Sequence, residues 1–144
     1  MPDALRVAAL RLLTRREHSR AELKAKLAPR AESAEQLETL LDNLQAQQLL
    51  SDSRYAGQRV AARAGRYGNR RLQQELRAAG VDDEAIAAAL PEGGDEAARC
   101  RGVWAKKFGH PPASAEERAK QMRFLQYRGF SPDAIRAVLA GAEP

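Results

Sequence analysis

Residues 50–81 decide the fold, and they read LSDSRYAGQRVAARAGRYGNRRLQQELRAAGV. Two short helical patterns meet here at a tyrosine–glycine turn, residues 67–68. Apolar residues recur every four positions on each side of the turn, which places them on one helix face: Ala56, Val60 and Ala64 before it, and Leu72 and Leu76 after it. The stretch therefore predicts one helix over about residues 53–66 and a second over about residues 69–79, ended by Gly80.

The same arrangement recurs along the chain with a period of 49 residues. Large aliphatic residues match in three sets: Leu27, Leu76 and Leu125; Leu37, Ile86 and Ile135; Leu41, Leu90 and Leu139. A glycine followed by an apolar residue matches in two copies, at 80–81 and 129–130. Repeats of this length indicate tandem units that bury their apolar faces locally and against neighbours. We predict an all-α fold of three tandem three-helix repeats, with limits at residues 1–50, 51–92 and 93–144.

The remaining helices are predicted from apolar periodicity and from end signals. A serine followed three residues later by Glu or Gln indicates a capping box, and this pattern occurs at 19–22, 33–36 and 114–117. Proline at the first helical position follows Ser131. We expect a linker at 91–94 and a frayed tail at 141–144. The expected helices span about residues 4–14, 20–28, 34–49, 82–90, 95–108, 115–128 and 132–140.

Composition excludes several classes of protein. The chain has 144 residues, 44% hydrophobic and only 5% aromatic, and no alternating run predicts a strand. Cys100 is the one cysteine, so no internal disulfide can form. No segment approaches the length of a membrane span, and no signal peptide is recognisable. We expect a cytoplasmic protein without membrane association.

Charge is banded along the sequence. The net charge is +5, with a pI near 9.8. Residues 54–77 contain seven arginines and one acid, whereas residues 78–98 contain six acids and no base. Residues 97–115 then contain four bases and no acid. Such banding predicts separate basic and acidic faces, and a basic face indicates a polyanionic partner.

The basic segment contains the candidate contact residues. Arg59, Arg63 and Arg66 fall on one helix face, and Tyr67 separates them from Arg70 and Arg71 at the start of the next helix. Guanidinium groups beside an aromatic ring suit a phosphate backbone or a splayed base. The alternative is a solvated face whose arginines pair with the acids at 82–84 or with a partner protein. A looser basic set follows in the third repeat: Lys106, Lys107, Arg118, Lys120, Arg123 and Arg128.

Nothing in the sequence indicates catalysis, a metal site or a cofactor. The two histidines, His18 and His110, are far apart, and no Cys/His spacing suits a metal. The acids at 82–84 sit at a helix start, where carboxylates oppose the positive end of the helix dipole. Trp104 and Phe108 lie four residues apart and are expected in the core, with Cys100 as a small buried hydrophobe. We expect a protein that is not an enzyme.

The chain resembles the RecX family of bacterial recombination regulators over nearly its whole length. Residues 19–23 are similar to the first repeat of that family, and residues 124–125, 128–130 and 135 to its last. The Pro111-Pro112 linker departs from the pattern and leaves the angle between the second and third repeats open. In the central repeat the matching residues are Leu50-Ser51-Asp52, Tyr55-Ala56, Arg63, Tyr67-Gly68, Arg71-Leu72, Glu75-Leu76 and Gly80-Val81.

The resemblance implies both architecture and partner. It implies three three-helix modules in an elongated, curved array. It also implies binding to the RecA filament on single-stranded DNA and inhibition of recombinase, ATPase and co-protease activities, which modulates recombination and the SOS response. Duplex DNA is a second nucleic-acid candidate, and a monomer is expected. Bridging of filament subunits and capping of a filament end both remain open.

Two other classes compete with this interpretation. One is a free-standing helix-turn-helix module that reads duplex DNA, with residues 69–77 as the recognition helix and Gln73 and Gln74 facing the bases. The other is a helical protein that binds an acidic partner without nucleic acid. Affinity for DNA that falls steeply with salt would separate direct phosphate contact from the last class.

Overall fold

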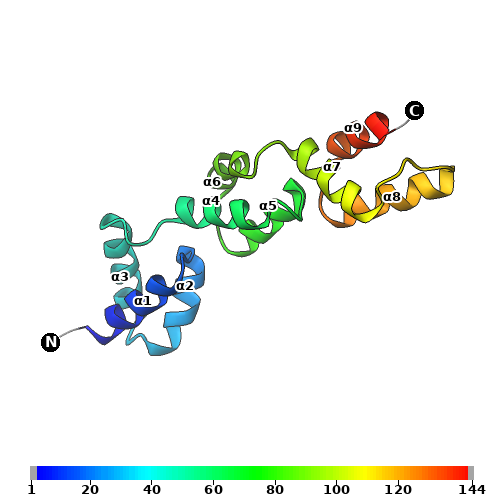
Figure 1. Cartoon of the computed structure of the whole chain (residues 1–144). Coiled ribbons are helices and arrows are strands. Elements are labelled where there is room, and N and C mark those ends of the chain that lie inside the picture. Colours follow the sequence, from blue (N-terminus) through cyan, green and yellow to red (C-terminus); the bar gives the residue numbers. More distant parts are fainter. Residues whose placement is uncertain (1–2, 143–144) are drawn as a thin grey trace.

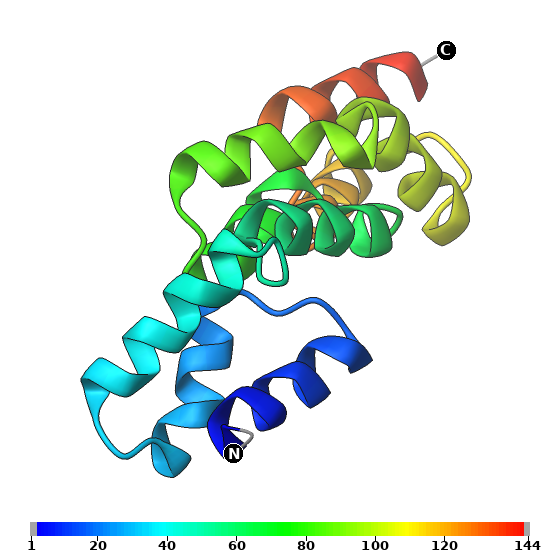
Figure 2. The same ribbon diagram turned by 90° about the vertical axis from the view of Figure 1, so that its left-hand side faces the viewer.

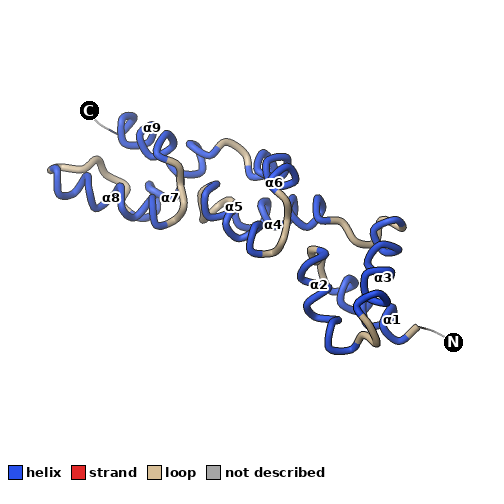
Figure 3. Tube along the Cα trace, turned by 180° about the vertical axis from the view of Figure 1, so that it is seen from behind, coloured by secondary structure: helices blue, strands red, loops and turns tan. Residues whose placement is uncertain are grey.

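The computed structural model describes residues 3–142, which form an elongated, curved array of helices with the chain ends at opposite extremes (Figure 1). Within these residues only helices, turns and loops occur, and no strand is present (Figure 3). This confirms the predicted all-α array of three-helix repeats. The helices are α1 (Ala4–Arg15), α2 (Arg20–Leu27), α3 (Ala34–Ala46), α4 (Asp52–Arg63), α5 (Asn69–Ala78), α6 (Asp83–Ala89), α7 (Glu96–Lys107), α8 (Ala115–Tyr127) and α9 (Pro132–Ala142).

Each repeat buries its own hydrophobic cluster. The first cluster is built from α1–α3 and closed by Leu50, the second from α4–α6, and the third from α7–α9. The leucines at 27, 76 and 125 are at most 1% exposed, so the 49-residue period marks equivalent core positions. Leu90 departs from its set, because it begins the short 3-10 helix η2 (Leu90–Gly93) and is only half-buried. The limits predicted for the repeats at residues 50 and 92 stay a prediction.

Several predicted helix ends are wrong by a few residues, each for a local reason. The helix expected to reach residue 49 ends at Ala46, because Gln48 adopts a positive φ of 63° and the chain turns to bury Leu50. Pro29 lies within a 3-10 turn (η1, Ala28–Arg30) after α2. The expected linker at 91–94 mostly forms η2, which packs on α4 so closely that a Cβ on Gly93 would lie 2.7 Å from Ala64 Cβ.

The C-terminal tail is also more helical than expected. Gly141 belongs to α9, which extends to Ala142, so the prediction of a frayed segment is wrong for these two residues. Residues 143 and 144, which complete the predicted tail, lie outside the described residues. Ser131 caps α9 as predicted, because its hydroxyl accepts the Ala134 backbone N–H at 3.3 Å.

Only one of the three predicted capping boxes is complete. Ser19 Oγ accepts the Glu22 N–H, and the Glu22 carboxylate accepts the Ser19 N–H in return. At the other two sites the serine caps the helix, but the returning side chain binds the residue before the cap. The φ angle is −73° at Ser19 but −155° at Ser33 and −151° at Ser114. The more extended φ turns the N–H of the cap away from the helix.

The first and second repeats meet at a joint made by backbone groups. The Ser19 hydroxyl donates to the Ala79 carbonyl at 2.6 Å, and the Arg20 backbone N–H donates to the Asp52 carboxylate at 2.7 Å. The N-terminus of α2 is therefore held by the end of α5 and the first residue of α4. We call this contact the first joint.

The second and third repeats meet in the same way. The Gly68 N–H donates to the Arg128 carbonyl at 2.9 Å, and the Asn69 N–H donates to the Glu96 carboxylate at 2.8 Å. Gly68 and Arg128 each lie 49 residues beyond their counterparts at the first joint, Ser19 and Ala79. The acid is again the first residue of the next repeat's first helix. This second joint settles how the second and third repeats meet, which the Pro-Pro linker had left open.

Two glycines with positive φ allow the close approach at these joints. Gly80 (φ 84°) lies at the first joint, where a Cβ would come 2.4 Å from Ala21 Cβ. Gly129 (φ 90°) is its counterpart at the second joint, where a Cβ would come 2.4 Å from Arg71 Cβ. Their predicted equivalence therefore has a physical basis in both conformation and space.

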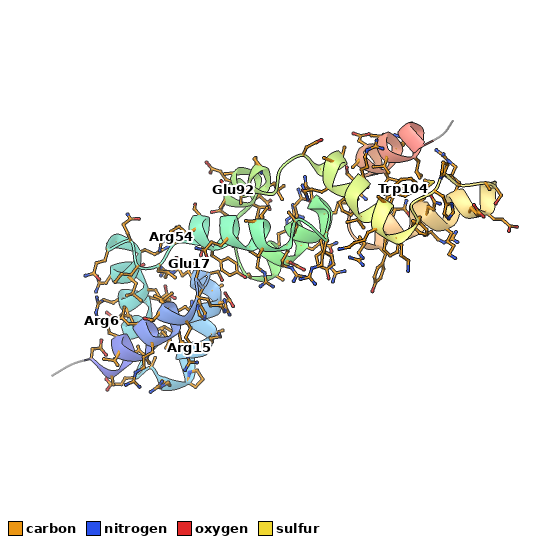
Figure 4. All side chains as sticks on the ribbon, in the orientation of Figure 1. Arg6, Arg15, Glu17, Arg54, Glu92 and Trp104 are labelled. Atoms are coloured by element: carbon orange, nitrogen blue, oxygen red, sulfur yellow. The ribbon has the colours of Figure 1, made fainter. Side chains whose placement is uncertain are left out.

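An ion pair strengthens the first joint. Glu17, in the loop before α2, and Arg54, on α4, point toward each other across the boundary (Figure 4), with Oε1 and Nε 3.0 Å apart. A side view shows the first repeat turned away from the line of the other two (Figure 2). This turn gives the array its curvature.

Candidate nucleic-acid interface

The Tyr67 ring lies at the second joint with three guanidinium groups against it. The guanidinium carbon lies 4.3 Å from the ring centroid for Arg71, 4.6 Å for Arg63 and 5.6 Å for Arg128. Arg63 comes from α4, Arg71 from α5 and Arg128 from the end of α8. Because the ring face is electron-rich, it stabilises cations that would otherwise repel one another. Residues from two repeats are thereby gathered into one cationic group.

Glu75 is the acid that organises this group. Arg63 binds its carboxylate with two hydrogen bonds, from Nε and Nη2, both 2.7 Å long. Arg71 Nε lies 3.7 Å from the same carboxylate, one helical turn away. The hydrogen bonds that Arg63 donates to Glu75 raise the pKa of Arg63. The group has three arginines and one acid, so it keeps a net positive charge of about two; Glu75 holds Arg63 and Arg71, and the Arg66 carbonyl accepts from Arg128 at 3.1 Å.

Arg99 holds the backbone beneath Tyr67. It donates to the Ala64 carbonyl at 2.9 Å and to the Tyr67 carbonyl at 3.1 Å, and it also binds the Asn69 side-chain oxygen at 3.0 Å. These contacts satisfy carbonyl groups at the end of α4 that have no helical partner. Burial lowers the pKa of Arg99 relative to an exposed guanidinium. Arg99 therefore positions the turn and is not available to a ligand.

The cationic group continues onto the third repeat through Arg128. Its guanidinium carbon lies 5.1 Å from the Phe124 ring centroid, and Lys107 Nζ lies 5.3 Å from the same ring. Lys106, Lys107, Phe124 and Arg128 line a hollow of about 180 Å³ together with Val103. Phe124 is itself anchored edge-on against Phe108, with 5.5 Å between centroids.

Three further arginines next to this group have exposed side chains: Arg66, Arg70 and Arg123. Within residues 3–142, no hydrogen-bond or ion-pair partner is found for their guanidinium groups. Their charges are therefore available to an anionic partner, in contrast to those of Arg63 and Arg71. We call the whole set the basic–aromatic band, and it consists of Arg63, Arg66, Tyr67, Arg70, Arg71, Lys107, Arg123, Phe124 and Arg128.

Lys106 lines the same hollow as Lys107 at the edge of the band, and the other three predicted contact residues lie away from it. Arg59 faces the first repeat and lines a hollow of about 200 Å³ with Arg16, Glu17 and Tyr55. Lys120 lines a different hollow, of about 140 Å³, beside the linker after α7. Arg118 is half-buried in the first turn of α8. The structure thus separates these three from the group around Tyr67.

The acids at 82–84 take little part in the band. Asp82 caps α6 by accepting the Ala85 N–H at 2.8 Å, and Asp83 and Glu84 lie in its first turn, so these acids are at a helix start as predicted. Asp83 pairs with Arg77 at 3.0 Å, and both side chains are well exposed. Among the arginines of residues 54–77, only Arg77 therefore pairs with an acid of residues 82–84, as the alternative interpretation predicted. Arg63 and Arg71 instead use Glu75.

The other polar and reactive groups are structural. Trp104 and Cys100 are buried as predicted, and Trp104 Nε1 donates to Gln121 Oε1 at 2.8 Å. Burial raises the pKa of the Cys100 thiol to about 12. Ser19 caps α2 as predicted, and its neighbour His18 is buried. Residues 3–142 contain no cluster of metal-ligating side chains, and none of their helices is long and apolar enough to cross a membrane.

Sequence reasoning missed three residues that shape this surface. Glu96 and Arg99 make the second joint, and Tyr127 is 79% exposed at the end of α8. The interleaving of basic and aromatic residues in Arg123-Phe124-Leu125-Gln126-Tyr127-Arg128 was the available signal for Tyr127. No sequence signal marked Glu96 and Arg99, because their partners lie 27 to 35 residues away.

Comparison with known proteins assigns the chain to a family. Family models for the first, second and third three-helix domains of RecX match residues 6–44, 51–90 and 95–139. The chain is 46% identical to Regulatory protein RecX of Ralstonia pickettii (99% of this chain, 90% of that one) and 48% identical to that of Chromobacterium violaceum (96% and 90%). The crystal structure of RecX from Lactobacillus salivarius has the same fold, with a TM-score of 0.85 at 21% identity (96% and 94% covered). The chain therefore belongs to the RecX family of regulatory proteins.

Proposed function

We propose that this regulatory protein binds the RecA filament on single-stranded DNA and inhibits its recombinase, ATPase and co-protease activities. Inhibition of this kind would modulate recombination and the SOS response. The RecX family assignment supports the choice of partner, and the basic–aromatic band supports direct contact with the DNA. The band is the single observation that carries the proposal, because it presents unpaired cations beside others held in fixed positions.

The band suits a phosphate backbone for a physical reason. Arg63, Arg71 and Arg128 are held against Tyr67, so little side-chain entropy is lost when they meet an anion. Arg66 and Arg70 add charges without a competing carboxylate. When such cations neutralise phosphates, the nucleic acid releases its condensed counterions into solvent, and affinity rises with the number of phosphates contacted.

Major-groove reading by α5 is disfavoured by the second joint. A recognition helix contacts base edges through its N-terminal residues. In α5 the N–H groups of Gly68, Asn69 and Arg70 are all bonded to the third repeat or to Glu96. A Cβ on Gly68 would lie 2.3 Å from Phe130 Cα, so no room remains for a groove wall there. We therefore rank the helix-turn-helix alternative second.

We also propose that the chain acts as a monomer. The core leucine follows the residue before the second helix by eight positions in the first two repeats, from Ser19 to Leu27 and from Gly68 to Leu76. In the third repeat the same interval, from Ser114 to Leu125, is eleven positions. The N-terminus of α8 is therefore displaced by almost one turn from the place where a joint forms in the other repeats. In the first two repeats, the N-terminus of the second helix forms the surface that binds the following repeat. The third repeat does not present this surface to a second copy of the chain. Terminal repeats of arrays commonly differ in this way.

The test uses RecA ATP hydrolysis on single-stranded DNA, titrated with the protein below the RecA concentration. The variant replaces Arg66, Arg70 and Arg123 by glutamine, which removes three unpaired charges and no recorded internal contact. The matched control replaces Arg11, Arg15 and Arg30 by glutamine, since these are exposed arginines of the first repeat (Arg15 is marked in Figure 4). We expect the first variant to lose most of the inhibition and the control to keep it.

Three outcomes would count against the proposal. Absence of inhibition by the wild-type chain at equimolar RecA would refute the choice of partner. Equal inhibition by both triple variants would refute the band as the contact surface. Tight, sequence-dependent binding to duplex DNA without inhibition would favour the helix-turn-helix alternative. Strong inhibition far below equimolar protein would further indicate capping of a filament end over coating.

A further inference from the structure

Tyr127 is the most exposed large hydrophobic side chain of the described residues, at 79%. The next are Leu49 at 40% and Val7 at 37%. Tyrosine is usually partly buried in monomeric proteins, because its ring is largely apolar. A ring held this far out in water contributes almost nothing to folding. Its position therefore calls for an explanation other than the hydrophobic core.

The surroundings of Tyr127 are basic. Arg123 lies one helical turn before it on α8 and is exposed, and Arg128 follows it directly. The backbone N–H of Arg70 is bonded to the Gly129 carbonyl at 3.0 Å, which brings the start of α5 to within two residues of Tyr127. Arg70 and Arg123, both with unpaired guanidinium groups, thus lie on backbone segments next to Tyr127 in different repeats.

The repeat architecture does not require an aromatic residue at this position. The landmark leucines place Ala78 of the second repeat in register with Tyr127, and Gln74 in register with Arg123. α5 and α8 end in the same way, since the N–H groups of Gly80 and Gly129 bond the carbonyls of Arg77 and Gln126, each at 2.9 Å. The same turn is thus built with alanine in one repeat and with tyrosine in the other.

We infer that Tyr127 stacks on an unpaired base of single-stranded DNA whose phosphates lie on the basic–aromatic band. This deepens the proposed function and rests on it, since the band supplies the phosphate contacts that bring a base to the ring. Aromatic rings that alternate with cations are the usual means of holding a single strand without regard to sequence. Bases within a duplex are already stacked and leave no face for the ring, so this contact favours single strands.

The test measures binding of a dT oligonucleotide of about 16 nucleotides by fluorescence anisotropy. Tyr127→Ala should weaken binding by about five-fold to about a hundred-fold, which corresponds to one stacked base. Tyr127→Phe should bind nearly as wild type, because it keeps the ring. Tyr127→Leu should bind as weakly as the alanine variant, because it keeps bulk but has no aromatic face.

Two readouts separate stacking from other roles of the residue. The slope of log affinity against log salt should stay at the wild-type value in Tyr127→Ala, whereas Arg70→Gln should reduce it by about 0.7. In an oligonucleotide that carries 5-iodouracil, irradiation should crosslink the base to Tyr127. Val7→Ala serves as the control for removal of an exposed apolar side chain and should change neither readout.

The outcomes distinguish this inference from the proposed function. If Tyr127→Ala and wild type bind dT equally but the variant no longer inhibits RecA, the ring contacts the recombinase and the inference is overturned. If Tyr127→Leu binds as wild type, a plain apolar contact explains the residue and the inference is again overturned. If Tyr127→Ala and Tyr127→Leu lose dT binding and Tyr127→Phe keeps it, while wild-type protein fails to inhibit RecA, the inference stands and the proposed function fails.

Discussion

Replacement of Gly68 by alanine tests whether the second joint is a single close-packed contact. The φ and ψ angles of Gly68 are −85° and 173°, a conformation that alanine adopts without strain. The added Cβ, however, would lie 2.3 Å from Phe130 N and Cα, and both are backbone atoms. Ordinary contact requires more than one ångström of additional separation, so the third repeat has to move away from the second.

The cost follows from the contacts that this movement breaks. Two backbone hydrogen bonds cross here, from Gly68 to the Arg128 carbonyl and from Arg70 to the Gly129 carbonyl. Each contributes about 0.5–1.5 kcal/mol, and the contact of Arg128 with the Tyr67 ring adds about 0.5–1 kcal/mol. We expect the free energy of unfolding to fall by about 1.5–4 kcal/mol, without loss of either hydrophobic cluster.

Urea denaturation followed by circular dichroism measures the total loss, and amide hydrogen exchange locates it. The Arg70 N–H should exchange much faster in the variant, because its partner lies across the joint. The Phe130 N–H should stay protected, because it bonds the Leu125 carbonyl within the third repeat. Gly65→Ala is the matched control, since nothing lies within 4 Å of a Cβ there. Wild-type stability together with a protected Arg70 amide in Gly68→Ala would refute the joint as described.

Two further predictions concern buried titratable groups. His18 is buried, with its Nδ1 3.0 Å from the Arg16 carbonyl and its Nε2 3.0 Å from Lys26 Nζ. Burial is the main cause that lowers the pKa of His18 below 6.5, and the charges of Arg16 and Lys26 lower it further. The folded state therefore favours the neutral form of His18. The stability that this preference adds is fully present above the pKa of the unfolded state and is lost as the pH falls below 6.5. We expect a lower urea midpoint at about pH 5.5 than at about pH 7.5, and a smaller difference in His18→Gln; an equal difference in both proteins would contradict this. The Cys100 thiol, with its pKa raised to about 12 by burial, should react with a disulfide reagent only at the rate of unfolding, and rapid reaction of folded protein would show that the site is open.

The repeat was visible in the sequence because cores impose periodicity. Leu27, Leu76 and Leu125 occupy one structural position three times, and helix geometry allows few other residues there. Helix ends were less predictable, because they depend on tertiary contacts. Gln48 takes a positive φ so that Leu50 reaches the first cluster, and η2 forms because α4 offers a surface for it.

The candidate site was predictable in composition but not in arrangement. The cluster of arginines around Tyr67 stands out in the sequence, yet Arg63 and Arg66 look equivalent there. In space Arg63 is bound to Glu75, whereas Arg66 has no recorded side-chain partner among residues 3–142. The membership of Arg128 was even less accessible, because it depends on a joint formed across 60 residues of chain. Distances of this kind follow from how repeats meet, which local periodicity does not encode.

Comparison of the two joints separates what the fold needs from what the surface offers. Each joint uses the same three groups. A donor just before the second helix of one repeat bonds a carbonyl at the end of the second helix of the following repeat, and an acid on the first helix of that following repeat accepts the next backbone N–H. At the first joint the position of Tyr67 is held by His18, which is buried and neutral. In the same register, the counterparts of Arg70, Arg71, Tyr127 and Arg128 are Ala21, Glu22, Ala78 and Ala79.

The first joint is therefore built without this concentration of arginines and rings. Its own arginines are largely neutralised, as Arg16 binds Glu22 at 2.8 Å and Arg20 binds Glu38 and Asp42 at 2.6 and 2.9 Å. If cations and rings served only to hold repeats together, both joints would need them. At the second joint, arginines lie over the Tyr67 ring, and Arg66, Arg70 and Arg123 are left unpaired within residues 3–142. At the first joint, Tyr55 is buried, and of Arg16, Arg20, Arg54 and Arg59 only Arg59 is unpaired in this part of the chain. The first joint thus acts as an internal control, and the difference between the two argues that the basic–aromatic band exists to meet a partner.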